Sequence, residues 1–564
     1  MSKVSILLAC VLAATGAWAQ MPHEVLLLVN RKSQPSMHVA NTFAAARQIP
    51  ERNMVYLDIP DKFFGGKATI TPEQFTSLIW EPANAAAKER GIDQQILAWV
   101  YSVDFPIRIK TDDNDRRQMS VGGLTFVRNR VPGLSLIEDG KFHSKLFAGP
   151  NDRLKFNLSA LSLGMMKSGL GEDVQVPAEV AYLQKGLQDD MPLPSMMLGY
   201  VGQNGNRLET VLDTIQRGVR SDYRGPRSGF YFVTSDDVRS KCREWQFAPV
   251  VDELQARGIT ATITTNFPAG VSDVMGLLMG AENVDPSKIG SFAPGAMAEH
   301  LTSWSAEFQR PQTKVTEWLK AGATASVGAV VEPYSNHNKF PSARFYAHYT
   351  SGCTMLESLY QSIACPLQTL MLGEPMARPY AVPLAVRLLG KDTVSQAFTY
   401  VAQVQCRIPN AEFRYSFLLD GKEIQPVSDN YSFPVRAEEL SDGYHELRVV
   451  ARMKHRVEFS ASSDRGIMVD RLGRSVSILP DIKQLMKYKH AIKVQIKGTD
   501  RPEQLRLLVG HHVIDEVPYS DDAQLTLDEL LVGEGPVRIR AVAVYGDGME
   551  VSSPPVATVV SFDG

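Results

Sequence analysis

The first hundred residues alternate short apolar runs with segments of helical periodicity. The alternation predicts strands at 25–29, 54–57 and 96–103 and helices at 37–47 and 71–90. The run at 96–103 is almost continuously apolar, as in a strand buried on both faces of a parallel sheet. Because the same alternation returns between about 196 and 372, the sequence predicts an α/β core with a doubly wound, mostly parallel sheet in two lobes.

The alternation of predicted strands and helices is interrupted once and then stops. Residues from about 110 to 194 have poor periodicity, which predicts an insertion in an α/β domain that spans 20–385. After about 382, short alternating runs separated by turn residues replace the helical period. They predict two all-β sandwiches of the immunoglobulin-like type, one over about 390–477 and one over about 478–564.

The N-terminus has the pattern of an export signal. Lys3 precedes an apolar run from Val4 to Ala14, and small residues stand at the cleavage positions before and at Ala19. We therefore expect residues 1–19 to be a signal peptide and the protein to be exported, periplasmic or secreted. The alternative is a lipoprotein-type cleavage before Cys10. No later stretch reaches the ~18 uncharged apolar residues of a spanning helix, so we expect no transmembrane segment.

Charge and cysteine content exclude several classes of function. Fifty-nine Lys and Arg against 62 Asp and Glu give a net charge of −3, which argues against a nucleic-acid partner. The four cysteines after residue 19 are too few for a disulfide framework. No Cys-x-x-Cys or His-Glu-x-x-His spacing occurs, and Asp112–Asp115 lacks the Gly and Glu of a calcium loop. We therefore expect no metal and no cofactor.

Polar residues that directly follow predicted strands are the first candidates for chemistry, because ligands of open α/β sheets bind beyond the carboxyl ends of strands. Turns and helix caps require the same residue types, so each position has a structural interpretation as well. These residues are Asn30, Asp104, Arg108, Asp236, Asp237, Glu282, Asn283 and Glu332.

The densest group of candidate catalytic side chains lies between Ala293 and Ser305. A helix over 296–303 would place His300 and Ser303 three residues apart on one face. His300 would then act as base and Ser303 as nucleophile, with Glu332 or Glu299 orienting the ring. The alternative is an ordinary entry from a loop into a helix, with a structural His–Ser contact. No Gly-x-Ser-x-Gly or Ser-x-x-Lys motif supports the catalytic alternative.

Several separated motifs resemble an uncharacterised family of exported bacterial proteins over about residues 23–380. The motifs are Val29-Asn30, Asp104-Phe105-Pro106-Ile107-Arg108-Ile109, Pro294-Gly295 through His300-Leu301-Thr302-Ser303, Gly328 through Val331-Glu332-Pro333, and Leu372-Gly373-Glu374-Pro375. The second lobe also resembles, more distantly, the gingipain and caspase group of cysteine peptidases. That resemblance implies a catalytic His at the end of one strand and a catalytic Cys at the end of the next.

The residues of that dyad are missing from the matching positions. Gly280-Ala281-Glu282 follows one predicted strand without a His, and the next element offers Ser303 but no Cys. We therefore expect a non-peptidase binding or surface protein on a gingipain-like scaffold, and the C-terminal β domains suggest a cell-envelope or protein partner. The alternative is a secreted hydrolase that uses His300, Ser303 and Glu332, so the sequence leaves open whether the protein is an enzyme.

Overall fold

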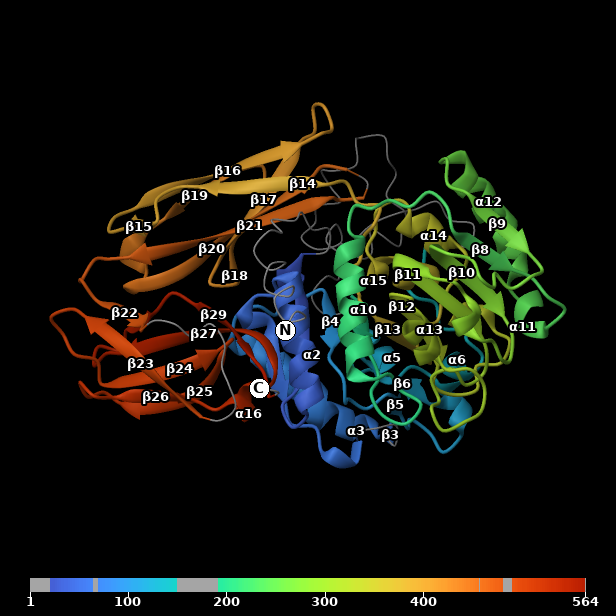
Figure 1. Ribbon diagram of the computed structural model, residues 1–564, viewed down its shortest axis with the longest axis horizontal. Helices are drawn as coiled ribbons and strands as arrows, with labels where there is room; N and C mark the ends of the chain where they lie inside the picture. Colours follow the sequence, from blue (N-terminus) through green and yellow to red (C-terminus); the bar gives the residue numbers. More distant parts are fainter. Residues whose placement is uncertain (1–20, 64–68, 150–190, 456, 480–488, 563–564) are drawn as a thin grey trace, which may run out of the picture.

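The computed structural model describes residues 21–63, 69–149, 191–455, 457–479 and 489–562 (Figure 1). The expected signal peptide and residues 150–190 of the expected insertion lie outside the described residues. Among the described helices, none combines the length and the apolar character needed to cross a bilayer.

A ten-stranded sheet forms the centre of the α/β part, in the order β2-β1-β4-β7-β13-β12-β11-β10-β8-β9. Its strands are β1 Val25–Asn30, β2 Met54–Leu57, β4 Ala98–Tyr101, β7 Ser195–Met197, β8 Phe230–Val233, β9 Ala261–Thr264, β10 Val274–Gly280, β11 Phe292–Leu301, β12 Ala325–Ala329 and β13 Thr369–Gly373. A small separate sheet contains β3 Thr69–Ile70, β5 Arg108–Ile109 and β6 Met119–Ser120.

The sheet consists of two lobes with the same internal strand order. Strands β2-β1-β4-β7 are parallel in the first lobe, and β9-β8-β10-β11 are parallel in the second. In each lobe the second strand lies on one side of the first (β2 beside β1, β9 beside β8), and the third strand lies on its other side (β4, β10). The direction in which strands are added therefore reverses between β1 and β4 and between β8 and β10. The expected α/β class with a doubly wound, mostly parallel sheet is therefore confirmed. Such reversal points are where open sheets bind ligands.

Helices cover both faces of this sheet (Figure 1). In β1, Val25, Leu27 and Val29 pack under α2 and α10, whereas Leu26 and Leu28 belong to the core on the other face. This burial on both sides explains the continuous apolar runs. The helices are α2 Gln34–Arg47, α3 Pro72–Phe75, α4 Glu81–Glu89, α5 Val121–Phe126, α6 Leu134–Glu138, α10 Leu208–Ser221, α11 Val238–Lys241, α12 Phe247–Ala256, α13 Val315–Ala321, α14 Arg344–Tyr349 and α15 Met355–Ser362.

The helix expected over 296–303 is wrong, because residues 296–301 belong to strand β11 and residues 302–303 follow that strand. Its residues pair in parallel with β10, with Met297 opposite Gly276 and Leu301 opposite Gly280. Alanine, methionine and glutamate favour a helix by intrinsic propensity. Here, burial between two neighbouring strands and under helices on both faces outweighs that preference.

A buried ion cluster joins elements that are far apart in the sequence. Arg47 at the end of α2 donates from Nε and Nη2 to the Glu374 carboxylate, at 2.9 and 2.7 Å, and from Nη1 to Asp222 at 2.7 Å. The side chains of Arg47 and Glu374 are completely buried. Glu374 follows β13 and Asp222 follows α10, so the cluster fixes the segments after β13 and α10 to the end of α2.

The C-terminal third is built of mostly antiparallel sheets of the immunoglobulin-like kind. Two hydrophobic cores lie in it, one over 381–469 with Cys353 and one over 476–560. The expected domain boundaries stay predictions. The elements are β14 Leu384–Leu389, β15 Thr393–Val394, β16 Phe398–Cys406, β17 Phe413–Leu419, β18 Lys422–Ser428, β19 Ser432–Val435, β20 Gly443–Met453, β21 Ser460–Val469, β22 Ser475–Ile478, β23 His490–Lys497, β24 Gln504–Val509, β25 His512–Pro518, β26 Gln524–Leu527, α16 Glu529–Val532, β27 Gly535–Val544, β28 Glu550–Ser552 and β29 Val556–Val560.

These β sheets pack against the first lobe. The Asn41 amide of α2 donates to the carbonyls of Val532 and Glu534, at 3.1 and 2.9 Å. Tyr56 of β2 stacks on His512 with ring centroids 5.3 Å apart. Since β2 is an edge strand of the large sheet, the C-terminal part covers an edge that would otherwise offer unpaired backbone groups.

We expect Arg47→Met to lower the free energy of unfolding of the α/β part by about 3–5 kcal/mol, because it strips buried carboxylates of their counter-ion. Urea denaturation followed by tryptophan fluorescence measures this, since every tryptophan after residue 18 lies between 80 and 318. Arg31→Met is the matched control, because the Arg31–Asp58 pair is exposed and is expected to contribute less than about 1 kcal/mol. Equal effects of the two substitutions would contradict the role of the buried cluster.

Candidate functional site

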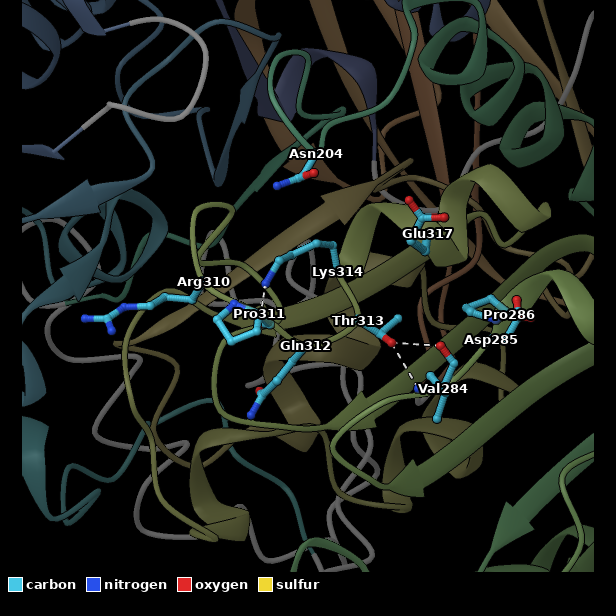
Figure 2. Close-up of a pocket in the computed structure, with 10 residues that line it drawn as sticks. All are labelled: Asn204, Val284, Asp285, Pro286, Arg310, Pro311, Gln312, Thr313, Lys314 and Glu317. Atoms are coloured by element: carbon cyan, nitrogen blue, oxygen red, sulfur yellow. Dashed lines mark hydrogen bonds between the residues drawn. The ribbon is translucent and has the colours of Figure 1, made fainter.

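A cavity of about 420 Å³ lies among loops that follow strands of both lobes (Figure 2). Its walls come from the loop after β7, the loop after β10, the loop between β11 and α13, and α13 itself. The lining residues are Asn204, Val284, Asp285, Pro286, Arg310, Pro311, Gln312, Thr313, Lys314 and Glu317.

Charged side chains of opposite sign lie on different sides of this cavity. Figure 2 shows Arg310 and Lys314 extending to one side, with Asp285 and Glu317 on the other. Within the described part of the chain, neither Arg310 nor Lys314 forms an ion pair with a carboxylate, whereas Glu317 pairs with Lys320. The exposed Arg310 guanidinium group lies over the Trp304 ring, and Glu307 acts on the charge of Lys314 without forming an ion pair with it. Both cations can therefore still contact an anionic group.

Lys314 is held by the backbone of its own loop. Its Nζ donates to the carbonyl oxygens of Trp304 and Pro311, at 2.7 and 2.9 Å. The residue is 6% exposed, and burial lowers the pKa of its ammonium group to about 8. Near neutral pH Lys314 is thus mainly charged, with one N–H not used by these two bonds.

Hydrogen bonds between the loops give the cavity a fixed frame. The Thr313 hydroxyl accepts from the Val284 amide at 2.9 Å and donates to the Val284 carbonyl at 2.7 Å. The Asn204 side-chain amide donates to the Phe308 carbonyl at 2.6 Å. These bonds connect the loops after β7, β10 and β11, so the cavity is preformed.

His300 lies behind this cavity and not in it. Its ring is 1% exposed on β11, and its Nδ1 accepts a hydrogen bond of 2.9 Å from the Trp318 indole of α13. Burial, followed by the charges of Arg243 and Lys314, lowers the pKa of His300 to about 3. The ring is therefore neutral at physiological pH and shielded from solvent, which does not suit a general base.

The neighbouring acid, Glu299, has a structural partner. Arg243 donates from Nη1 to the Glu299 carboxylate at 2.6 Å, and both side chains are buried. Because successive strand residues point to opposite faces, Glu299 lies on the other side of β11 from His300. Glu299 therefore neutralises a buried guanidinium group and does not orient the imidazole ring.

Ser303 and Glu332 follow β11 and β12 separately. Ser303 is half-buried just beyond β11. The Glu332 carboxylate accepts from the Tyr334 amide at 2.9 Å, an ordinary turn contact. Over the described residues, no hydrogen bond or ion pair joins any two of His300, Ser303 and Glu332. The structure supplies no catalytic constellation from them.

Several of the other polar residues that follow predicted strands form contacts with other side chains or with the backbone. The Asn30 side-chain amide donates to the Asp104 carbonyl at 2.9 Å, and Arg108 forms an ion pair with Glu307. Asp237 caps α11 by accepting from the Arg239 amide.

Sequence reasoning missed Lys314, because an isolated lysine before a short helix gives no local signal. It also missed Tyr200, whose partners lie on distant segments.

The thiols do not form a peptidase dyad in the part of the chain described here. None of the four cysteines after residue 19 forms a disulfide with another described residue, and Cys353 and Cys365 are buried. β10 is followed by Ala281 and Glu282, and β11 by Thr302 and Ser303. The described residues also contain no cluster of three or more His, Cys, Asp or Glu side chains arranged for a metal ion.

No protein-family model matches the sequence, and none of the curated proteins is similar to it. Among solved structures, the chain is similar to the Arg-specific cysteine proteinase gingipain R at 9% identity, over 82% of this chain and 99% of that one, with a TM-score of 0.39. The complex of the Porphyromonas gingivalis RgpB pro- and mature domains matches at 8% identity, over 79% of this chain and all of that one, with a TM-score of 0.38.

The fibronectin(III)-like modules of Clostridium thermocellum CbhA match at 14% identity, over 31% of this chain and 93% of that one, with a TM-score of 0.14. The gingipain-type and immunoglobulin-type resemblances expected from the sequence are thus found as distant structural matches. At these scores, the matches carry no information about activity.

Burial of His300 has a consequence for stability. Between pH 6.5, its ordinary pKa, and about 3, the unfolded chain binds a proton that the folded chain does not, so the free energy of unfolding falls as the pH falls. We expect His300→Asn, which keeps an acceptor for Trp318, to reduce this slope by up to about 1.4 kcal/mol per pH unit. Urea denaturation between pH 7 and 4 measures the slopes, and identical slopes would contradict the buried neutral ring.

Proposed function

We propose that this protein binds small carboxylate-bearing molecules and that its ligand occupies the cavity between the loops after β7, β10 and β11. The proposal rests on Arg310 and Lys314, two cations that share one wall and have no carboxylate partner among the described residues. Lys314 is buried, and buried charges are normally paired, so its lack of an ion pair favours an anionic ligand. Arg310 is exposed and adds a second positive charge to the same wall.

The size and the opposite wall of the cavity narrow the ligand class. A volume of about 420 Å³ accommodates a small molecule or the end of a peptide. Asp285 and Glu317 on the other side favour a ligand that also carries a hydrogen-bond donor or a positive charge. Dicarboxylates, amino acids and short peptides are therefore the first ligands to test.

Binding explains the described site better than hydrolysis does. A hydrolase that used His300 would need a solvent-accessible ring whose pKa lies near the working pH. His300 instead accepts a hydrogen bond from a buried indole and has a pKa of about 3. We therefore set the hydrolase alternative aside in favour of a non-peptidase binding protein.

Export is part of the same proposal. The N-terminal pattern up to Ala19 supports a periplasmic or secreted location. The β sheets contact the first lobe through α2 and β2 and leave the cavity-lining loops to the α/β part. In this arrangement the α/β part binds the ligand, and the C-terminal sheets stabilise it and offer a surface to an envelope or protein partner.

We expect Arg310→Gln to weaken the binding of succinate or glutamate about tenfold, because a charge-assisted hydrogen bond is lost. Isothermal titration calorimetry on the full chain measures the dissociation constants. Arg220→Gln is the matched control, since Arg220 is exposed on α10 and outside the cavity. The proposal fails if the wild-type protein binds none of the carboxylates, or if both variants bind as the wild type does.

Affinity for the same carboxylates should also depend on pH. The pKa of Lys314 is about 8 in the folded protein, so its ammonium group loses its proton as the pH rises through that value. We expect the affinity for succinate to fall about tenfold or more between pH 6.5 and 9.5. Lys314→Met should bind weakly over the whole range. An affinity that is constant with pH would exclude Lys314 as the anion partner.

A further inference from the structure

The reversal point of the first lobe holds a second group of polar side chains, separate from the cavity. Asn30 is the last residue of β1, Ser33 caps α2, Asp104 follows β4, and Tyr200 follows β7. We call Asn30, Ser33, Asp104 and Tyr200 the β1/β4 niche. They lie beyond the carboxyl ends of three neighbouring parallel strands, where open α/β sheets bind ligands.

Asp104 is held in position by two side chains. The Ser33 hydroxyl donates to its carboxylate at 2.5 Å, and the Asn30 amide donates to its carbonyl at 2.9 Å. Its φ of 59° lies in the left-handed region, which costs most non-glycine residues energy. The carboxylate is partly buried, and no cation of the described chain forms an ion pair with it. Burial raises the pKa of Asp104, which means that the surroundings disfavour its charge.

Tyr200 provides the second, independent observation. The residue is 3% exposed, and its hydroxyl is buried without a hydrogen-bond partner in the structure. Its ring stacks on Phe308 at a centroid distance of 3.7 Å and an angle of 5°, which fixes the direction of the hydroxyl. Asp104 and Tyr200 each stand three residues beyond Tyr101 and Met197, which pair in register on the neighbouring strands β4 and β7. In agreement with this placement, burial and then the charges of Asp104 and Glu307 raise the pKa of Tyr200.

The charge of the β1/β4 niche determines which kind of ligand it can bind. Glu307 is neutralised by its ion pair with Arg108, which also donates to the Thr69 hydroxyl at 2.9 Å. Asp104 therefore leaves one uncompensated negative charge beside a phenol that lacks a partner. A primary ammonium group carries one positive charge and three N–H donors, so it satisfies both groups together.

We propose that the β1/β4 niche binds a primary ammonium group, with the Asp104 carboxylate as its counter-ion and the Tyr200 hydroxyl as a second hydrogen-bond partner. A structural role for Asp104, as an acid near the N-terminus of α2, is the competing explanation. The two explanations differ in what removal of the polar atoms does. A structural group stabilises the folded chain, whereas a group kept for a ligand destabilises it when the ligand is absent.

The test uses n-butylammonium as a probe of the full chain. Melting temperatures are measured in rising n-butylammonium chloride, with sodium chloride at equal ionic strength and tetramethylammonium chloride, which has no N–H, as references. We expect a saturable rise with n-butylammonium alone, because a ligand that binds the folded state raises its stability. No saturable rise in the wild-type protein would overturn the proposal.

Two variants test whether n-butylammonium binds at the β1/β4 niche. Asp104→Asn keeps the left-handed backbone, which asparagine tolerates, and should weaken the probe about tenfold or more. Tyr200→Phe removes a hydroxyl without a partner, so it should weaken the probe several-fold while the melting temperature without probe stays equal or rises. Asp213→Asn and Tyr231→Phe, at positions outside the niche, are the matched controls and should behave as the wild type.

Two outcomes would show that these groups are structural. One is an Asp104→Asn variant that melts several degrees lower and binds the probe as the wild type does. The other is a Tyr200→Phe variant that loses stability with unchanged affinity. If Asp104→Asn fails to fold, Tyr200→Phe decides alone, since its change is a single oxygen atom in a buried ring.

Discussion

The burial of the large sheet on both faces is the constraint on which the rest of this protein depends. Strands β1, β10 and β11 are inaccessible over nearly their whole length, so the polar chemistry is confined to the residues that follow each strand. The charges that remain inside the layers, such as Arg47 with Glu374 and Arg243 with Glu299, form buried ion pairs. An imidazole in the same layer, His300, stays neutral for the same reason.

Ion pairing therefore distinguishes the buried arginines from Lys314. Arg47 and Arg243 hold segments together, and each meets a carboxylate at hydrogen-bond distance. Lys314, by contrast, is nearly as buried as these arginines, yet backbone carbonyls are its hydrogen-bond acceptors. Lys314 therefore lacks the carboxylate partner that both buried arginines have, which is the observation behind the proposed anionic ligand.

Much of the fold could be predicted from the sequence, because the apolar runs at 25–29 and 96–103 have a single physical explanation, burial on both faces. The helix over 296–303 could not be corrected from the sequence, since alanine and methionine give no sign of the strands on either side. Of the polar residues after predicted strands, Asn30 and Asp104 were found because their place in the chain marks them. Tyr200 stacks on Phe308, more than a hundred residues further along the chain, which no local pattern records. Lys314 is held by carbonyl groups of its own loop, and the sequence does not show how that loop folds around it.

The cavity and the β1/β4 niche are connected through one side chain, Glu307. It lies in the loop after β11, forms an ion pair with Arg108 of the first lobe, and supports the charge on Lys314. It also acts on the Tyr200 phenol, whose ring stacks on Phe308 in the same loop. If the proposed anion and the proposed ammonium group bind at Lys314 and Asp104, both act on Glu307. Because binding free energies are linked reciprocally, any change that one ligand makes in the affinity of the other is matched by the same factor in return.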